Sequence, residues 1–168
     1  CVEEFLVTRP TEMLDLMRWS VNVANPTDNT GLREVLIHAL VATDLADEAI
    51  TIAARYPNDF ASTEYGRVLA FFAAGRLEEA ETALKAAAAR SPKVWKMLHA
   101  TNPKVPRFNP RGITIGGDDE AYDYRKNHIE LWRSTGALKW GAAIKLPARP
   151  TAKPKTALPV DTKQKPLF

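Results

Sequence analysis

Residues 71–92, FFAAGRLEEAETALKAAAARSP, contain the features that decide the fold. Gly75 followed by a basic residue is typical of a helix end. Alanine, the strongest helix former, then dominates up to Arg90. Ser91-Pro92 stops that helix, and the proline is suited to the first turn of another. The stretch therefore predicts two helices joined by a tight turn at Gly75, with a third helix beginning at Pro92.

The same kind of pattern extends through the preceding and following residues. Apolar residues recur at helical spacing, and segments rich in Pro, Asn and Asp separate them. Residues 101–117 contain three prolines and three glycines without a helical pattern, and Asp118-Asp119 are expected to cap the next helix. No sustained period-two alternation favours a sheet. We predict an all-α fold with helices near residues 10–24, 32–43, 47–55, 62–74, 77–90, 92–100 and from 118 onward.

A repeat is the most informative feature of these helices. Asp47-Glu48-Ala49 returns in the next pair of helices as Glu78-Glu79-Ala80. The stops at Pro26, Pro57 and Pro92 follow one another at a similar interval. A period of about 34 residues with two helices per unit is the spacing of the tetratricopeptide repeat, or TPR. The spacing predicts a TPR-like α-solenoid, and an ordinary helical bundle with an accidental period is the alternative.

Short motifs in a distinctive order resemble one TPR-like family. In chain order these are NPTDNTGLR at 25–33, YPND at 56–59, NPKVP at 102–106, AYDY at 121–124 with Trp132, and GALKW at 136–140. The family includes the suppressor of tumorigenicity protein 7 and bacterial TPR-containing proteins, and the similarity covers about residues 10–140. The resemblance implies a helical repeat scaffold closed by a C-terminal helix, and it implies no catalytic residues. The basic, Gly-rich residues after Pro106 depart from the family pattern.

Composition limits the other classes of protein. The chain has 168 residues, enough for one domain with an appendage. Its apolar run at 68–74 is far shorter than the roughly 20 residues that span a bilayer. The single cysteine, Cys1, excludes a disulfide framework. A trimmed start is one reading of Cys1, and the first residue of a mature lipoprotein is another. We expect a soluble, cytoplasmic protein without membrane partners.

No catalytic or cofactor motif is recognisable. The sequence lacks a phosphate-binding loop, a dinucleotide fingerprint and a His-Glu-x-x-His motif. The histidines 38, 99 and 128 fall on separate predicted elements. His128 with the acids 118–120 is an alternative metal site, but capping and the helix dipole already explain those acids. We predict a protein that is not an enzyme and needs no cofactor or metal.

Aromatic and basic residues near the end of the body raise the question of binding. Tyr122, Tyr124, Trp132 and Trp140 are expected to pack over the end of the repeat, and an aromatic platform for a peptide or nucleic acid is the alternative. The loop at 102–117 mixes cationic side chains with an aromatic one. It is either an ordinary solvated loop or a partner-binding loop through Lys104, Arg107, Phe108 and Arg111.

The tail differs from the body in charge and composition. The net charge is +3, yet residues 141–168 carry six basic residues and one acid, so the tail is +5 and the body −2. Five prolines between 147 and 166 favour an extended or disordered tail. Its end, QKPLF, resembles the peptide that binds bacterial sliding clamps. The candidate partner-binding residues of the tail are Lys153, Lys155, Gln164, Leu167 and Phe168.

Together these features predict two segments, a helical domain at 1–140 and a basic tail at 141–168. We expect an adaptor or assembly factor that binds protein partners, within a larger assembly, through a TPR-like groove and the tail. The alternative is an accessory factor of DNA replication or of nucleic-acid complexes, whose tail docks on a clamp or contacts nucleic acid.

Overall fold

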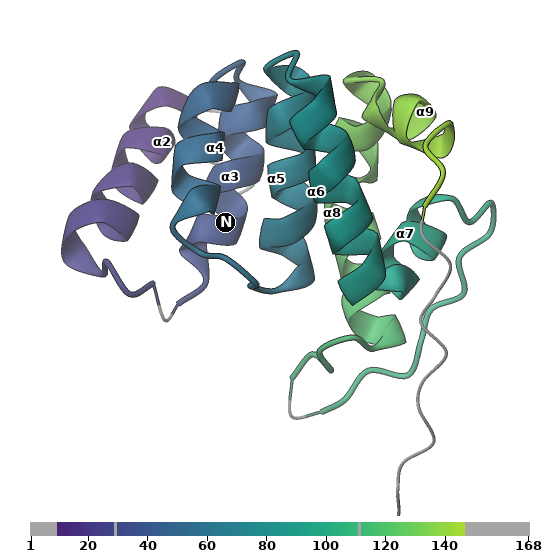
Figure 1. The fold of residues 1–168 in the computed structure, drawn as a ribbon. Helices are drawn as coiled ribbons and strands as arrows, with labels where there is room; N and C mark the ends of the chain where they lie inside the picture. The colour runs from purple at the N-terminus through teal and green to yellow at the C-terminus, as the bar shows by residue number, and fades with distance from the viewer. Residues whose placement is uncertain (1–9, 29, 111, 147–168) are drawn as a thin grey trace, which may run out of the picture.

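The computed structural model describes residues 10–28, 30–110 and 112–146. In these residues eight α-helices pack in sequential pairs without any strand, as Figure 1 shows, so the prediction of an all-α fold is confirmed. A π-helical turn, η1, directly follows the helix at Pro10–Trp19. The elements are α2 (Pro10–Trp19), η1 (Ser20–Ala24), α3 (Leu32–Ala42), α4 (Ala46–Ala54), α5 (Ala61–Ala73), α6 (Leu77–Arg90), α7 (Pro92–Leu98), α8 (Asp118–Ser134) and α9 (Ala137–Ala142).

The hairpins α3–α4 and α5–α6 turn in the same way, at equivalent positions of the sequence repeat. In the second hairpin the amide of Arg76 donates to the carbonyl of Phe71, and Gly75 to Phe72. In the first, the amide of Leu45 donates to Leu40, and Asp44 to Val41. These pairs of bonds define the Schellman motif, in which the first residue beyond the helix adopts the left-handed backbone conformation with a positive φ. Gly75 has φ +73° and Asp44 has φ +59°, so the predicted turn at Gly75 is confirmed.

The two hairpins pack against each other through small residues. Ala49 and Ala80, the small residues of the repeat, are fully buried. Gly66 lets α5 approach α3, because a Cβ there would lie 2.8 Å from Ile37 Cγ2. Small residues at such positions allow helix axes to come close together. The larger side chains that complete this part of the core are Leu36, Leu40, Tyr65, Val68, Leu69 and Leu84.

A buried arginine ties the loop before α3 to the loop before α5. Arg33 donates to Asp59 through Nε (2.6 Å) and Nη2 (2.9 Å), and to Asp28 Oδ2 through Nη1 (2.9 Å). Asp28 also accepts from the amides of Leu32 and Arg33 and so caps α3. The Tyr56 ring lies 4.8 Å from the guanidinium. The motifs at 25–33 and 56–59 thus meet in one structural clamp.

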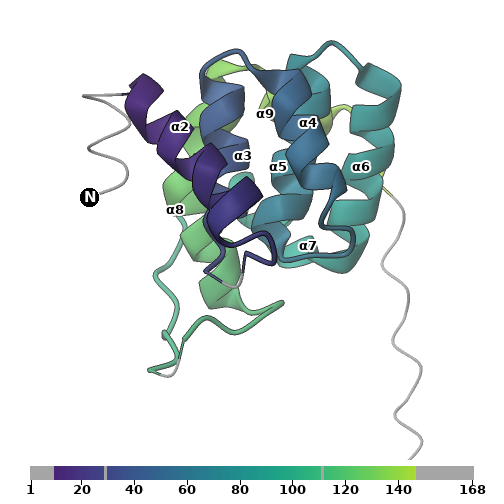
Figure 2. The same ribbon diagram turned by 90° about the vertical axis from the view of Figure 1, so that its left-hand side faces the viewer.

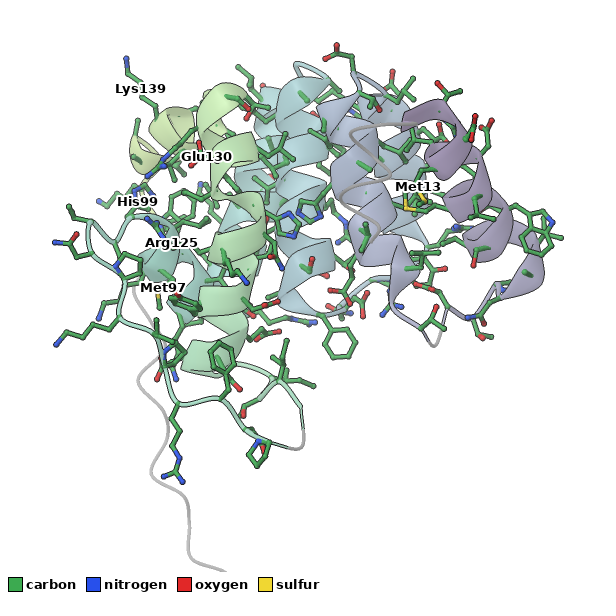
Figure 3. All side chains as sticks on the ribbon, turned by 180° about the vertical axis from the view of Figure 1, so that it is seen from behind. Met13, Met97, His99, Arg125, Glu130 and Lys139 are labelled. Atoms are coloured by element: carbon green, nitrogen blue, oxygen red, sulfur yellow. The ribbon has the colours of Figure 1, made fainter. Side chains whose placement is uncertain are left out.

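Helix α8 packs against α5 and contacts His38 of α3, whereas α7 packs against α6 and α8. Figures 1 and 2 agree that α8 lies on the side of α3 and α5 that faces away from α4 and α6. Figure 3 shows Arg125 of α8 pointing toward Met97, and its guanidinium donates to the carbonyls of Met97 (2.9 Å) and Leu98 (2.7 Å). Arg125 therefore satisfies the exposed carbonyl end of α7.

The expected capping role of Asp118-Asp119 is confirmed in part. Gly117 occupies the N-cap position of α8, whereas the Asp119 carboxylate accepts hydrogen bonds from the first-turn amides of Asp119 and Glu120. Asp118 instead pairs with Lys93 (3.0 Å), and Asp119 accepts from the amide of Thr114 (2.8 Å). These acids lie inside the first turn, where the helix dipole favours them, and one of them fixes the preceding loop.

Candidate functional site

A groove of about 940 Å³ opens between α3 and α8. This volume lies toward the upper end of the range for ligand sites in proteins. The start of α5 and the loop at 101–117 complete its walls. The lining residues are Thr30, Gly31, Glu34, Val35, His38, Ala39, Ala42, Phe60, Ser62, Ile113, Ile115, Glu120, Asp123, Tyr124, Asn127, His128 and Leu131.

Two acidic residues at the start of α8, Asp119 and Glu120, fix the loop wall of the groove. Glu120 Oε2 accepts from the amide of Gly116 (2.6 Å), while its Oε1 accepts from the amide of Ala61 at the start of α5 (3.4 Å). The loop thereby holds Ile113 and Ile115 along the groove, with Ile115 70% exposed. An isoleucine this exposed next to a groove provides an apolar surface for a ligand.

Two histidines, one from α3 and one from α8, line the groove. The His38 and His128 rings stack with centroids 3.7 Å apart and an interplanar angle of 14°. His38 Nδ1 lies 2.7 Å from the Glu34 carbonyl oxygen, so this nitrogen donates. In the neutral ring His38 Nε2 is then an acceptor, and the Tyr124 hydroxyl at 3.2 Å donates to it. The same hydroxyl accepts from Trp132 Nε1 (2.9 Å), which completes a one-way chain of hydrogen bonds.

The environment of the stack keeps both rings neutral. Burial lowers the pKa of His38 to about 4. Burial, together with the charge that His38 would carry, lowers the pKa of His128 to about 2. A proton on His38 Nε2 would also remove the acceptor of the Tyr124 hydroxyl. The pair therefore acts as an aromatic surface at neutral pH, with no net charge.

The charge of the groove comes from carboxylates. Glu34, Glu120 and Asp123 line it, and among the lining residues that the structure describes there is no lysine or arginine. Burial raises the pKa of Glu34, an effect that Arg33 partly offsets. Asp123 accepts from the Asn127 side chain at 3.3 Å. The groove thus combines apolar walls with acidic polar groups. No cluster of three or more metal-ligating side chains occurs in the part of the chain that the structure describes.

Three of the predicted loop residues, Lys104, Arg107 and Phe108, are not among the residues that line the groove. Lys104 and Arg107 are exposed, and Phe108 contacts Tyr122 edge to face with centroids 6.1 Å apart. Arg111 and the tail residues Lys153, Lys155, Gln164, Leu167 and Phe168 lie outside the described residues, as does Cys1. Binding by the loop and by the tail therefore stays a prediction.

Of the four aromatic residues expected to pack over the end of the repeat, Tyr124 and Trp132 are buried and Trp140 packs on Phe72 with centroids 5.0 Å apart. Tyr122 instead contacts Phe108 of the loop. The packed helical part extends beyond residue 140, where the sequence analysis placed the boundary with the tail. Helix α9 ends at Ala142, and the side chains of Ile144 and Leu146 still pack against the core.

Sequence reasoning missed the groove. Tyr124 and His128 are four residues apart, a spacing that places them on one face of a helix. That spacing was the available signal, yet nothing in it identified His38 as the partner of Tyr124, 86 residues away.

Comparison with protein-family models, with curated proteins and with solved structures found no match to this chain. Within residues 10–28, 30–110 and 112–146, no helix combines the length and the apolar character that crossing a membrane requires.

Proposed function

We propose that the chain is a protein–protein interaction module, an adaptor without enzymatic activity built on a TPR-like α-solenoid. The observation that carries the proposal is the groove between α3 and α8, which has apolar walls, acidic polar groups and a stacked pair of neutral histidines. Such a surface is suited to bind a segment of another protein.

The repeated hairpins support the TPR-like interpretation. Their two turns share one hydrogen-bond pattern at equivalent positions of the repeat, and α3 and α5, the first helices of the two hairpins, pack against each other. In helical repeats such first helices line one continuous binding surface. Here α8 borders that surface and converts it into a groove.

The polar groups of the groove support binding rather than chemistry. Both ring nitrogens of His38 are engaged, one by the Glu34 carbonyl and the other by the Tyr124 hydroxyl. Glu120 uses both carboxylate oxygens on backbone amides. These groups hold the walls in place and are not arranged as a nucleophile and its base.

A matched pair of variants tests the proposal. Ala42 lines the groove and Ala86 lies on α6, and both side chains are exposed. Partners of the full chain would first be captured from cells, purified, and titrated calorimetrically against both variants. Ala42→Trp fills the groove, so we expect at least about tenfold weaker binding, equivalent to ~1.4 kcal/mol. Ala86→Trp should bind as the wild type does. Equal binding by the two variants would refute a groove-based function.

A further inference from the structure

Among the described residues that line the groove, all the charged side chains are acidic. Glu34 and Asp123 lie on opposite walls, one on α3 and the other on α8. Neither forms an ion pair with another of the described residues. A partly buried carboxylate gains most from a cationic partner that also brings hydrogen bonds. The two walls therefore favour a ligand that carries lysine or arginine.

The walls of the groove also select the conformation of the ligand. They are mostly the side-chain faces of α3 and α8, whose backbone hydrogen bonds are already used within the helices. An extended peptide would find no sheet edge to pair with and would bury unpaired amides. A helix satisfies its own backbone, so it can present side chains alone. The wall from Gly31 to Ala42 measures about 16 Å, close to three helical turns.

We propose that the occupant of the groove is a basic amphipathic helix of a protein partner. Its apolar face packs on Val35, Ala39 and Leu131, and its lysine or arginine side chains reach Glu34 and Asp123. This inference rests on the proposed function, since it names the ligand of the same groove. An acidic helix or a nucleic acid would meet like charge there.

Three designed peptides of about 14 residues, long enough for the three turns of the groove wall, test the inference by fluorescence anisotropy with the full chain. They share one leucine-rich face and carry lysine, glutamine or glutamate on its flanks. We expect the lysine peptide to bind roughly tenfold more tightly than the glutamine peptide, and the glutamate peptide to bind most weakly.

Isosteric variants assign the effect to the groove. The double variant Glu34→Gln/Asp123→Asn should weaken the lysine peptide about tenfold and leave the glutamine peptide unchanged. Asp47→Asn/Glu78→Gln removes the same charge from the first turns of α4 and α6 and should change neither. Equal loss in the two double variants would reduce the effect to overall charge and overturn the inference.

The outcomes separate this inference from the proposed function. If the glutamine peptide binds as tightly as the lysine peptide and Ala42→Trp abolishes both, the groove binds a helix but the basic partner is wrong. If Ala42→Trp weakens no peptide and no natural partner, both proposals fail. A variant with the four substitutions Lys153→Gln, Lys155→Gln, Lys163→Gln and Lys165→Gln tests the chain's own tail as the occupant of the groove. If this variant binds the lysine peptide and the wild-type chain does not, the tail fills the groove and the partner helix is ruled out.

Discussion

The repeated hairpins and the C-terminal helices are held together over very different distances along the chain. In the hairpins the linking side chains are close in sequence, as with Arg33 and Asp59, 26 residues apart. The C-terminal part instead reaches back over the chain, since Glu120 bonds the amide of Ala61 and Tyr124 bonds His38, 86 residues away. The hairpins are therefore held by contacts between neighbouring elements, whereas α8 packs on the preceding α7 and depends in addition on contacts that span most of the chain.

This difference has a functional meaning. One wall of the groove belongs to the hairpins and the other to the helix that docks on them. The groove exists only while α8 is docked. Stability of the α8 interface and affinity for a ligand should consequently be linked, because a ligand that spans both walls stabilises the docked state.

Removing the main anchor of α8 should give the largest effect on stability. Trp132 is fully buried, contacts Tyr65 and Trp95, and donates to Tyr124. We expect Trp132→Ala to lower the free energy of unfolding by about 4 kcal/mol, from lost burial and a residual cavity. Urea denaturation measures the loss, and hydrogen exchange should show α8 losing protection before α3–α6.

Trp19→Ala is the matched control, because Trp19 is 56% exposed on α2. We expect its effect to stay within about 0.5 kcal/mol. Simultaneous loss of protection in α8 and in both hairpins of the Trp132→Ala variant would show that the two regions unfold as a single unit.

Breaking the loop clamp should be the next largest effect, and it should act on the hairpins. Burial alone would raise the pKa of Asp59, but hydrogen bonds from Arg33 and Thr63 outweigh it and lower the pKa. Arg33→Met leaves Asp28 and Asp59 without their cation, and we expect a loss of about 3 kcal/mol in urea denaturation. Arg76→Met, which removes the exposed Arg76–Glu79 pair, should cost at most about 1 kcal/mol. Similar losses in the two variants would contradict the clamp.

The hairpins could be predicted from sequence because their signals are local. Left-handed turn residues, alanines at a fixed period and proline stops each act within one helical turn of their position. The loop contact of Asp119 was not predicted, for the opposite reason. An acid at a helix start is expected to bond the first-turn amides, and its additional bond to the amide of Thr114 depends on the fold of the preceding loop.

Acid should destabilise the region where the two parts meet. The pKa of His128 is about 2 in the folded chain, below the value of about 6.5 for an unperturbed histidine. The unfolded chain therefore binds more protons as the pH falls, so stability is full above about pH 6.5 and declines below it. For one such ring the expected loss at pH 5 is about 2 kcal/mol.

His128→Phe keeps a ring on His38 and removes one titrating group. We expect the difference in unfolding free energy between pH 7.5 and pH 5 to be about 2 kcal/mol smaller in this variant than in the wild type. Urea denaturation at both pH values measures it. An unchanged difference would mean that His128 is not kept neutral by the fold.

The candidate groove was harder to predict than the fold, for a reason that the histidines make plain. His38 and His128 lie at ordinary positions of two amphipathic helices, and each alone reads as a core or surface residue. Their stacking depends on the position of α8 beside α3, which no local pattern encodes. The short helix α9, only six residues long, was likewise not predicted as a separate element.

The smallest expected effect tests whether the two hairpin turns are physically equivalent. Asp44 and Gly75 occupy the same place in their Schellman motifs, but only glycine adopts a positive φ without a steric cost. Asp44→Gly should therefore stabilise the chain, helped by removal of a negative charge at the C-terminus of α3, by about 0.5 to 1 kcal/mol. Gly75→Asp should destabilise it by a similar amount.

The double variant sharpens this test. If the turns are equivalent, Asp44→Gly/Gly75→Asp exchanges their residues and should unfold within about 0.5 kcal/mol of the wild type, because distant sites add. Thermal unfolding of the four proteins measures each change. A Gly75→Asp loss several times the Asp44→Gly gain would show that the second turn bears constraints that the first does not. The sequence repeat would then describe the path of the backbone and not its energetics.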